Sequence, residues 1–586
     1  MWIAYGEKNR RDDDFSRRRK GLLIGFLLVM ALLVARAMHL QIVDRHFLQK
    51  QGSLRHVDVV TVSAYRGKVL DRHGEPLAVS TPVQSIWVDP KHFHVETPAQ
   101  LRQLAELIGM PLENLSKAVD ATSGRRFVYL KRRVSPELAD KASALAIPGV
   151  FFEREFKRYY PAGEVTAHLL GFTNIDDVGQ EGMELAYEKY LRGQPGSKRV
   201  IRDGKRQIIG DIESVKAPVS GKDLILSIDQ RLQYLAYREL KSAVKKHQAS
   251  AAAMVVLDAK TGEVLAVVNQ PSFNPNTNRH LTNDVMRNRA LTDVFEPGST
   301  VKPFVIAYAL DAGYITPEFS IDTSPGSVKV GRHTVKDVHN YGRLDLTGIL
   351  KKSSNVAVSQ IALMMPPESF WRFYHQLGFG TVPGTGFPGE ASGSLLDYRR
   401  WHVVEQATLS YGYGLSASVL QLARAYTALA DDGVLHSVSL LKRPQDTLAR
   451  RVMTPATARR VRTMLEQVVQ KDGTAYGARV EGYRVAGKTG TIKKLQAGGG
   501  YTQNRYMSAF VGMAPASDPR LVIAVIVDEP NAGVYYGGLV AAPVFAQVMA
   551  GALRALNVPP DQREAMPVLA PPPLLASSEE GGGNVP

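Results

Sequence analysis

The longest apolar stretch of the chain lies near its N-terminus. Residues Gly21 to Ala35 carry no charge, and beyond Arg36 the apolar pattern continues to Val43. A membrane span needs about 20 residues, so Gly21–Val43 is long enough if Arg36 extends to the outer interface. Basic residues before the stretch favour a cytoplasmic N-terminus: Arg10, Arg11, Arg17, Arg18, Arg19 and Lys20. We predict a basic cytoplasmic tail over 1–20 and a transmembrane anchor over 21–43, with the bulk of the chain outside.

The same segment has a second interpretation. Ala35-Arg36-Ala37 has the small-x-small form of a signal-peptide cleavage site, so the stretch could be removed after export. The apolar pattern continues past this site to Val43, whereas the apolar region of a signal peptide would end there. We therefore favour a retained anchor.

The pattern changes twice more along the chain. Residues 44–215 are mixed, with turns rich in Gly and Arg, and they hold no catalytic constellation that a structural role would not explain. From Leu224 onward, periodic and apolar segments predict a folded domain over 216–557. After Val558 the chain is rich in Pro, Gly and Ser, which predicts a disordered tail over 558–586.

Within 216–557, strands stand at both ends of a helical middle. Ala252–Leu257 and Val264–Val268 form a predicted hairpin, and Met507–Met513 and Leu521–Val527 are two apolar strands. The expected flanking helices are Gln230–His247 and Leu539–Leu556. This order predicts an α+β domain whose sheet joins its first and last segments.

Composition narrows the choice of partners. The 586 residues are too many for one core, so two or three domains are expected. The formal charge of +16 is scattered, without an aromatic-basic or zinc-finger motif, so we expect an anionic envelope or membrane and no nucleic acid. The chain has no cysteine, which excludes thiolate metal sites and cysteine nucleophiles. We expect no metal and no cofactor.

Three short motifs are candidates for catalysis, and each has copies elsewhere in the chain. They are Ser299-Thr300-Val301-Lys302, Ser353-Ser354-Asn355 and Lys488-Thr489-Gly490-Thr491. The copies are Ser242/Lys245, Ser439/Lys442, Ser272/Asn274 and Lys260-Thr261-Gly262. Ser242 lies on the polar stripe of its predicted helix, Ser439 at a predicted strand end, and Lys260 in a hairpin turn. Structural roles explain these three better.

Ser299 has a different context. Pro297-Gly298 breaks the chain before it, and an apolar helix without a polar face follows. Pro303 requires that helix to start near Ser299, which places the serine at a helix N-terminus that favours an oxyanion. Lys302 lies one turn on, and burial would lower its pKa and make it a base. The structural alternative is a helix cap with an extended lysine.

The other two motifs fit the same chemistry. Ser353-Ser354-Asn355 falls between two apolar stretches, where a helix cap is an equally good interpretation. Lys488-Thr489-Gly490-Thr491 has glycines that let a ligand approach a strand closely. Taken together, a serine, an internal lysine, a second hydroxyl with an amide, and a cation beside an open strand suit acyl transfer from a substrate that carries a carboxylate.

The chain resembles class B penicillin-binding proteins, and among them the division-specific type. The triplet of motifs is the signature of serine β-lactamases and penicillin-binding proteins. Further matching segments are Arg66-Gly67, Asp71-Arg72-His73-Gly74, Tyr160–His168, Gly179–Glu184, Asn288-Arg289-Ala290 and Tyr411–Ser416. The Pro161–His168 stretch and the short region before the catalytic domain favour the division type over the elongation type.

The resemblance implies a fold and a partner set. It implies a transmembrane helix, an elongated non-catalytic pedestal or dimerisation-type domain over 44–215, and a transpeptidase domain with an antiparallel sheet flanked by helices. It also implies a bacterial inner-membrane protein that acts outside the cytoplasm at the division septum. Expected partners are peptidoglycan stem peptides, β-lactams, a polytopic glycosyltransferase and other division proteins.

It also implies roles for the motif residues. Ser299 would attack a D-Ala-D-Ala stem, with Lys302 as base and Ser353 and Lys488 as proton-relay or electrostatic partners. Asn355 would hold the peptide amide, Thr489 and Thr491, flanking Gly490, would bind the terminal carboxylate, and the backbone amides of Ser299 and Thr491 would form the oxyanion hole.

Two alternatives use the same serine fold. One is a β-lactam hydrolase or sensor. Such proteins are usually built around the catalytic domain, so the presence of a pedestal of roughly 200 residues counts against this alternative. The other is a non-catalytic scaffold of the division machinery, against which the intact triplet counts.

Overall fold

The chain forms two compact units, each assembled from segments that are separated in sequence. The computed structural model describes residues 6–48, 57–95, 97–120, 127–202, 208–277, 282–443, 448–495 and 500–562. The first unit contains Met1–Tyr65, Thr81–Lys157 and Gly193–Gly221; the second contains Arg66–Ser80, Arg158–Arg192 and Lys222–Pro586. The predicted tail lies outside the described residues from position 563 onward.

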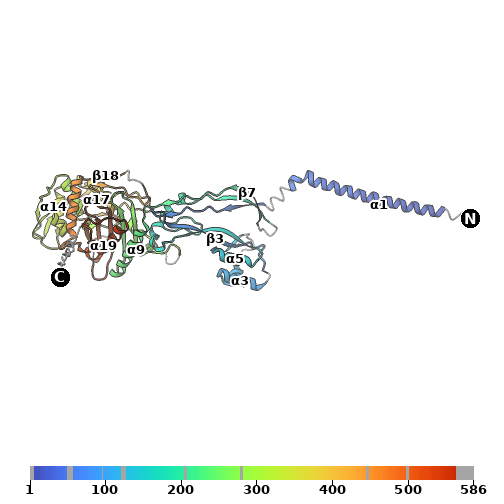
Figure 1. Cartoon of the computed structure of the whole chain (residues 1–586), viewed down its shortest axis with the longest axis horizontal. Helices are drawn as coiled ribbons and strands as arrows, with labels where there is room; N and C mark the ends of the chain where they lie inside the picture. The colour runs from blue at the N-terminus through green and yellow to red at the C-terminus, as the bar shows by residue number, and fades with distance from the viewer. Residues whose placement is uncertain are drawn as a thin grey trace, which may run out of the picture. The chain divides into compact units, whose positions relative to one another are not determined.

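The N-terminal helix belongs to the first unit (Figure 1). Helix α1, Gly6–Met38, continues into a π-helical turn, η1, His39–Val43. Its segment Ser16–Val43 has a mean hydropathy of 2.4 and no buried residue, so by length and composition it could cross a membrane. Helix α19, Gly537–Ala555, is also long and apolar, but it is 61% buried and is a core helix of the second unit.

The rest of the first unit contains two strand arrangements. Strands β1, β6 and β7 form an antiparallel sheet in the order β1-β6-β7. Strand β4 pairs with β3, and helices α3, α4 and α5 share a core with these strands, which includes Ile86, Leu104 and Leu130. The bounds are β1 Val57–Val62, β3 Pro76–Val88, α3 Pro98–Ile108, α4 Leu112–Asp120, β4 Val128–Val134, α5 Pro136–Ala144, β5 Val150–Tyr159, β6 Gly196–Arg202 and β7 Ile208–Lys216.

The second unit is built on a five-stranded antiparallel sheet in the order β10-β9-β21-β20-β19. The strands are β9 Ala251–Asp258, β10 Val264–Gln270, β19 Ala486–Leu495, β20 Tyr501–Ala514 and β21 Leu521–Asp528. Strand β9 pairs along its whole length with β21, from Ala251 opposite Asp528 to Asp258 opposite Leu521. The prediction that the sheet joins the first and last segments of the domain is therefore confirmed.

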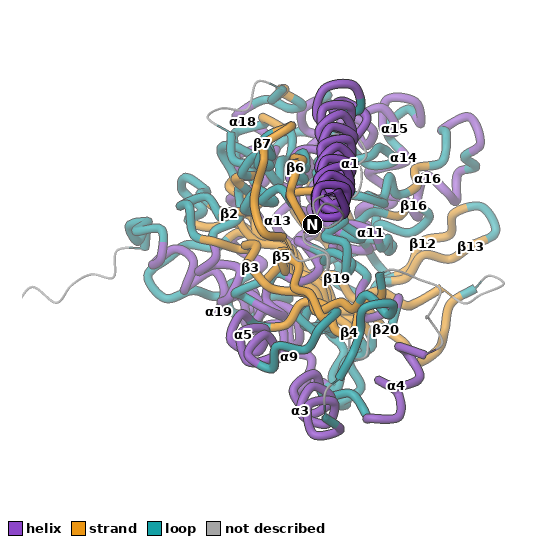
Figure 2. The backbone as a smooth tube through the Cα atoms, turned by 90° about the vertical axis from the view of Figure 1, so that its right-hand side faces the viewer, coloured by secondary structure: helices purple, strands orange, loops and turns teal. Residues whose placement is uncertain are grey.

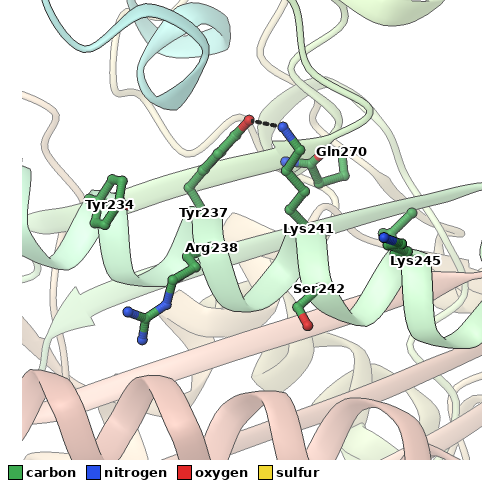
Figure 3. Close-up of a pocket in the computed structure, with 8 residues that line it drawn as sticks. Tyr234, Tyr237, Arg238, Lys241, Ser242, Lys245 and Gln270 are labelled. Carbon is green, nitrogen blue, oxygen red and sulfur yellow. Dashed lines mark hydrogen bonds between the residues drawn. The ribbon is translucent and has the colours of Figure 1, made fainter.

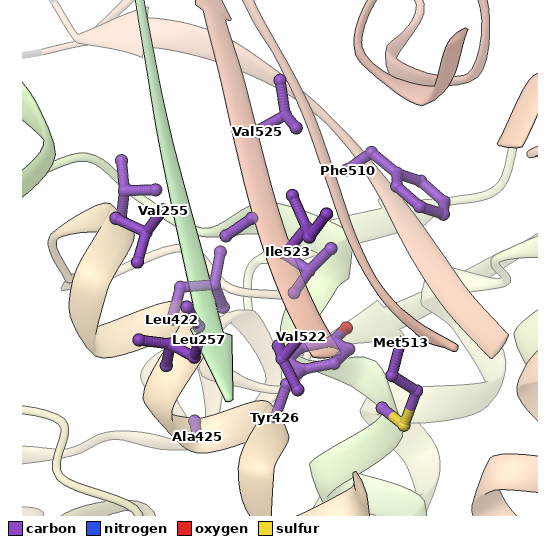
Figure 4. Close-up of a cluster of buried hydrophobic side chains, with 14 of the residues drawn as sticks. Val255, Leu257, Leu422, Ala425, Tyr426, Phe510, Met513, Val522, Ile523 and Val525 are labelled. Atoms are coloured by element: carbon purple, nitrogen blue, oxygen red, sulfur yellow. The ribbon is translucent and has the colours of Figure 1, made fainter. Parts of the chain in front are cut away.

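Helices cover both faces of this sheet. Val255 and Leu257 of β9 lie toward Leu422 and Ala425 of α17, Val419–Ala430 (Figure 4). Phe510 lies on the other face. It pairs with Val525, which in turn pairs with Met254. Met254 faces away from its neighbour Val255 because side chains alternate along a strand. The Phe510 ring packs on Phe545 of α19 at 4.7 Å between centroids. Coverage on both sides explains why β9, β10 and nearly all of β21 are buried without alternation.

Helix α9, Gln230–His247, packs beside α19 and against β10 (Figure 1). Its predicted bounds are confirmed. The helical middle lies between β10 and β19 and carries two of the three motifs. Its main helices are α12 Lys302–Asp311, α13 Leu346–Lys352, α14 Asn355–Leu363, α15 Pro367–Gln376, α16 Val403–Leu409, α17 and α18 Pro455–Val468. Strands β12 Ser327–Val330 and β13 His333–Lys336 form a separate ribbon (Figure 2).

Candidate active site

Ser299 lies in a 3-10 turn, η3, Gly298–Val301, that leads directly into α12. The helix thus starts where Pro303 requires, with a tighter first turn. Gly298 has a φ of +58°, and a Cβ there would lie 2.7 Å from Cγ1 of Ile492 on β19. Only glycine allows the turn and the strand to approach this closely. Ser299 is half-buried, and its hydroxyl makes no side-chain hydrogen bond among the described residues.

Lys302 begins α12 and is fully buried. Its amine donates to the backbone carbonyl of Ser353 and to Oδ1 of Asn355 at 2.7 Å, and it lies 3.2 Å from Oγ of Ser353. Burial lowers the pKa of Lys302 well below the usual lysine value, and the nearby charge of Lys488 lowers it further, whereas Asp337 raises it. The neutral form of the amine, which can accept a proton, is therefore favoured more than in an exposed lysine.

Ser353 connects two helices in an uncommon backbone conformation. It ends α13 with a φ of +61°, a left-handed conformation that is unusual for serine. The next residue, Ser354, caps α14 by accepting from the backbone N–H of Ala357 at 3.0 Å. The cap interpretation of this motif is thus correct for Ser354, while the side chains of Ser353 and Asn355 contact Lys302.

Asp337 holds this corner in place, and sequence reasoning missed it. Its carboxylate accepts from the Ser354 hydroxyl at 2.5 Å and from the backbone N–H groups of Asn355 and Val356 at 2.5 and 3.0 Å. A carboxylate at a helix N-terminus is stabilised by the free N–H groups of the first turn. Asp337 comes from the loop after β13, and no local pattern in the sequence marks it.

Lys488, from the third motif, also contacts the hydroxyl of Ser353. It lies on β19, is fully buried, and places its amine 2.9 Å from Oγ of Ser353. Burial lowers the pKa of Lys488 to about 7. The hydroxyl of Ser353 therefore lies within hydrogen-bonding distance of both buried lysines, although the three residues are far apart in sequence.

The remaining residues of the third motif lie on β19, the edge strand of the sheet. Thr489 Oγ1 donates to Oγ1 of Thr474 at 3.0 Å, and Thr491 Oγ1 accepts from the backbone N–H of Gly537 at 3.1 Å. A Cβ on Gly490 would lie 3.1 Å from Cγ2 of Thr300, so the glycine lets β19 approach the turn that holds Ser299. Within the described residues, β19 pairs with a strand on one side only, so it is an edge strand of the sheet.

Two copies of the motifs, at Lys260 and Ser439, have contacts that give them a structural role. Lys260 pairs with Asp431 and Asp518 at 2.9 and 2.7 Å, and these partners outweigh burial and raise its pKa. Ser242 is exposed on α9. Ser439 Oγ donates to the carbonyl of Leu441, two residues away.

Glu296, three residues before Ser299, is a further group that sequence reasoning missed. It is 9% exposed, accepts from the backbone N–H of Gly414 at 2.8 Å, and accepts from the hydroxyl of Tyr501 at 3.0 Å. Burial raises its pKa. The hydrogen bond from Tyr501 connects the segment before Ser299 with the start of β20.

Comparison with known proteins supports one family. Residues 252–550 match the model of the penicillin-binding protein transpeptidase domain, and residues 61–226 match that of the penicillin-binding protein dimerisation domain. The chain belongs to the penicillin-binding protein transpeptidase family. The first match contains all three motifs, and the second covers most of the region in which no catalytic constellation was expected.

Named relatives cover nearly the whole chain. It is 45% identical to the "Probable peptidoglycan D,D-transpeptidase PenA" of Neisseria meningitidis serogroup A, over 92% of this chain and 93% of the relative. It is 43% identical to the "Peptidoglycan D,D-transpeptidase FtsI" of Escherichia coli K12, over 95% and 96%. These relatives place the chain among the class B penicillin-binding proteins, as its motifs predicted.

Solved structures agree with the fold. The transpeptidase domain of Burkholderia pseudomallei penicillin-binding protein 3 is 48% identical, with a TM-score of 0.54. The match covers 58% of this chain and 98% of the chain in that structure. A peptidoglycan synthetase from Bifidobacterium adolescentis is 25% identical, with a TM-score of 0.69, and covers 87% of this chain and 98% of its own.

Proposed function

We propose that this protein is a peptidoglycan D,D-transpeptidase that cross-links stem peptides during septal wall synthesis through an acyl-enzyme on Ser299. The observation that carries the proposal is the meeting of three motifs at the Ser353 hydroxyl, beside two buried lysines with lowered pKa values. Relatives at 43–45% identity bear the names of such transpeptidases.

In the first half-reaction, Ser299 Oγ attacks the carbonyl carbon between two D-alanines, and its proton passes to the neutral amine of Lys302. The C–N bond then breaks, and the departing D-alanine receives a proton through Lys302 or through Ser353 and Lys488. The short contact between Lys302 and the carbonyl of Ser353 fixes the amine on the side of the motif hydroxyls. Contacts of this kind often tighten toward the nucleophile only when substrate is bound.

The negative charge that develops on the attacked oxygen needs donors. We assign the backbone N–H groups of Ser299 and Thr491, since the turn η3 and strand β19 approach each other at Gly298 and Gly490. Each donor of an oxyanion hole contributes about 3 kcal/mol to the rate in measured cases. In the second half-reaction, an amine from another stem attacks the ester and restores Ser299.

Substrate binding is assigned to residues around the open edge of β19. Asn355 would hold the peptide amide of the donor, and Thr489 and Thr491, flanking Gly490, would bind its terminal carboxylate. Lys488 adds positive charge when protonated, and its pKa of about 7 makes that charge depend on pH. A β-lactam would acylate Ser299 by the same route and stall there.

The N-terminal helix supports attachment to the inner membrane. We propose a single span over 21–43 with a cytoplasmic N-terminus, because the basic residues precede the span. The catalytic unit would then face the lipid-linked wall precursors, beside a glycosyltransferase and other division proteins. N-terminal sequencing of the protein from bacterial membranes tests this. A mature chain that starts at Met38 and is released by salt would contradict it.

Mass spectrometry after exposure to a penicillin tests the nucleophile. One adduct is expected on the peptide that contains Ser299, absent in Ser299→Ala and retained in the matched control Ser242→Ala. An adduct that persists in Ser299→Ala would contradict the assignment. A donor peptide ending in D-Ala-D-Ala, supplied with an amine acceptor, then separates a transpeptidase from a scaffold, and fast loss of the penicillin adduct would instead indicate a hydrolase.

A further inference from the structure

The segment that leads into the Ser299 turn is held by backbone hydrogen bonds to the loop that follows α16. Phe295 and Ala417 exchange two such bonds, at 3.0 and 2.9 Å, and the N–H of Gly298 donates to the carbonyl of Gly412 at 3.1 Å. A Cβ on Gly412 would lie 2.1 Å from the carbonyl oxygen of Gly298, so only glycine allows this contact. The turn η3 therefore has a fixed position relative to this loop.

The contact between the same turn and β19 is of a different kind. It is apolar, as between Gly298 and Ile492. Van der Waals contacts have little directional preference, whereas hydrogen bonds are directional. Among the described residues, the only hydrogen bonds between 295–301 and the hairpin of β19 and β20 are those of Glu296 with Tyr501. These bonds are therefore the directional connection between the turn and the hairpin.

Glu296 makes this connection with a buried carboxylate. Its Oε1 accepts from the backbone N–H of Gly414 at 2.8 Å, and its two oxygens accept from the hydroxyl of Tyr501 at 3.2 and 3.0 Å. The residue is 9% exposed and makes no ion pair with a described residue, so these hydrogen bonds must satisfy the carboxylate. Tyr501 begins β20, which pairs with β19. The carboxylate thus links the segment before Ser299 to the hairpin that carries Thr491.

We propose that Glu296 is a positioning residue, which holds the Ser299 turn at the spacing from β19 that directs the backbone N–H groups of Ser299 and Thr491 to one oxyanion. This inference rests on the proposed function, because it concerns the oxyanion hole assigned there. Such donors act by being in place before the reaction, and loss of one costs about 100- to 1,000-fold in rate. A loosened spacing should cost part of this, about tenfold. Glu296 acts through the turn and not on the substrate.

Tyr501→Phe in the full-length protein in detergent is the principal test. It removes the hydroxyl and keeps the ring, which packs edge-on against Tyr413 at 5.3 Å between centroids. Stopped-flow measurement with a penicillin separates the affinity of the first complex from the rate constant of acylation. The rate constant should fall about tenfold, while the affinity and the thermal midpoint stay unchanged. A normal rate constant would overturn the proposal. A loss confined to the affinity would also overturn it, because Tyr501 would then contact the ligand.

Tyr237→Phe is the matched control. The hydroxyl of Tyr237 also donates to a carboxylate, that of Glu164, but it lies on α9, where it accepts from Lys241 at 2.9 Å (Figure 3). Helix α9 packs against β10, at the opposite edge of the sheet from β19. This variant should acylate at the normal rate. Equal losses in Tyr237→Phe and Tyr501→Phe would overturn the proposal, because the position of the bond would then not matter.

Two substitutions of Glu296 separate positioning from a role of its charge. Glu296→Gln keeps an oxygen that can accept from Gly414 and gains an amide that can donate to the Tyr501 oxygen, so its rate constant should stay close to normal. Glu296→Ala removes both bonds and should be about tenfold slower. Adding Tyr501→Phe to Glu296→Ala should cause no further loss, because the two residues form one connection. A Gln variant as slow as the Ala variant, or additive losses, would overturn the proposal.

Hydrogen exchange of the peptide that contains Ser299 tests the same connection without acylation. The backbone N–H groups of η3 should exchange faster in Tyr501→Phe and in Glu296→Ala than in the unaltered protein, and normally in Tyr237→Phe. Equal exchange in all four proteins would overturn the proposal. Absence of a penicillin adduct in the unaltered protein would contradict the proposed function instead, so the two failures are distinguishable.

Discussion

Arg66 and Arg158 lie buried beside Glu184, and Lys302 and Lys488 lie buried beside Ser353, all within the second unit. Glu184 accepts from Arg66 and Arg158 at 2.6 Å each, and Glu188 adds a further pair with Arg66 at 2.7 Å. The two lysines make no ion pair among the described residues, and their pKa values fall.

The difference between the two clusters shows that a buried cation can have either a structural or a catalytic role. A buried cation must either be paired or become neutral. The coulombic attraction of Glu184 raises the pKa of Arg66 despite the opposing effect of burial, so the guanidinium stays charged. The lysines face hydroxyls, an amide and a carbonyl, so they can give up a proton and act as bases. Breaking one cluster should cost stability, and breaking the other should cost rate.

The largest effect is expected from Lys302→Met. Loss of the base should lower the acylation rate by a penicillin about 100- to 10,000-fold. The thermal midpoint should change little, because removal of a buried amine that has no ion pair is offset by the hydrogen bonds that Ser353 and Asn355 lose. Stopped-flow acylation and thermal unfolding measure the two quantities. Lys302→Arg, which retains the charge, should be equally slow, and an active Arg variant would show that something else activates Ser299.

Arg66→Met should produce the opposite pattern. It leaves Glu184 with one of its two buried partners, and breaking a buried pair costs about 3–5 kcal/mol. The free energy of unfolding should fall by that order, while the folded fraction acylates at the normal rate. Denaturant titration of the purified protein measures the first quantity. Normal stability with slow acylation would mean that the cluster serves catalysis.

The pH dependence should separate the two lysines. Acylation needs neutral Lys302, so the rate should fall as pH drops through its lowered pKa. If protonated Lys488 holds a substrate carboxylate, the rate should also fall as pH rises through about 7, by up to tenfold per unit. A rate profile with two limbs is expected, and in Lys488→Arg the upper limb should disappear. A profile flat on both sides would exclude titration of these amines.

The free energy of unfolding should also depend on pH through Lys488, and the direction follows from the lowered pKa of this lysine. Between about pH 7 and the ordinary lysine pKa of about 10.4, the unfolded chain binds a proton on Lys488 that the folded protein does not. The free energy of unfolding should therefore rise with pH across this window. Comparison with Lys488→Met, in which this contribution is absent, isolates the effect.

The smallest effect is expected at Lys260, the copy of the third motif. Its two ion pairs are partly exposed, at 31% for the lysine side chain, and such pairs contribute about 0–1 kcal/mol. Lys260→Gln should lower the free energy of unfolding by at most about 1 kcal/mol and leave acylation unchanged. A marked loss of acylation would mean that the two motifs were assigned to the wrong roles.

The sequence alone determined the local elements of this protein. The bounds of α9, the hairpin of β9 and β10, the apolar strands β20 and β21 and the final helix follow from periodicity and apolar runs, and all of them were predicted. The membership in the penicillin-binding family also followed, because short motifs with fixed spacing identify it. These features depend on neighbours in the chain.

Tertiary structure decided the contacts between distant residues. Asp337 could not be found from its own segment, because its role is to hold Ser354 and the start of α14. Arg66–Ser80 and Arg158–Arg192 precede the predicted catalytic domain, yet they pack into the unit that contains the motifs. The lowered pKa of Lys488 likewise depends on burial by a sheet assembled from both ends of the domain. Burial and pairing are properties of the folded chain, so a local pattern does not encode them.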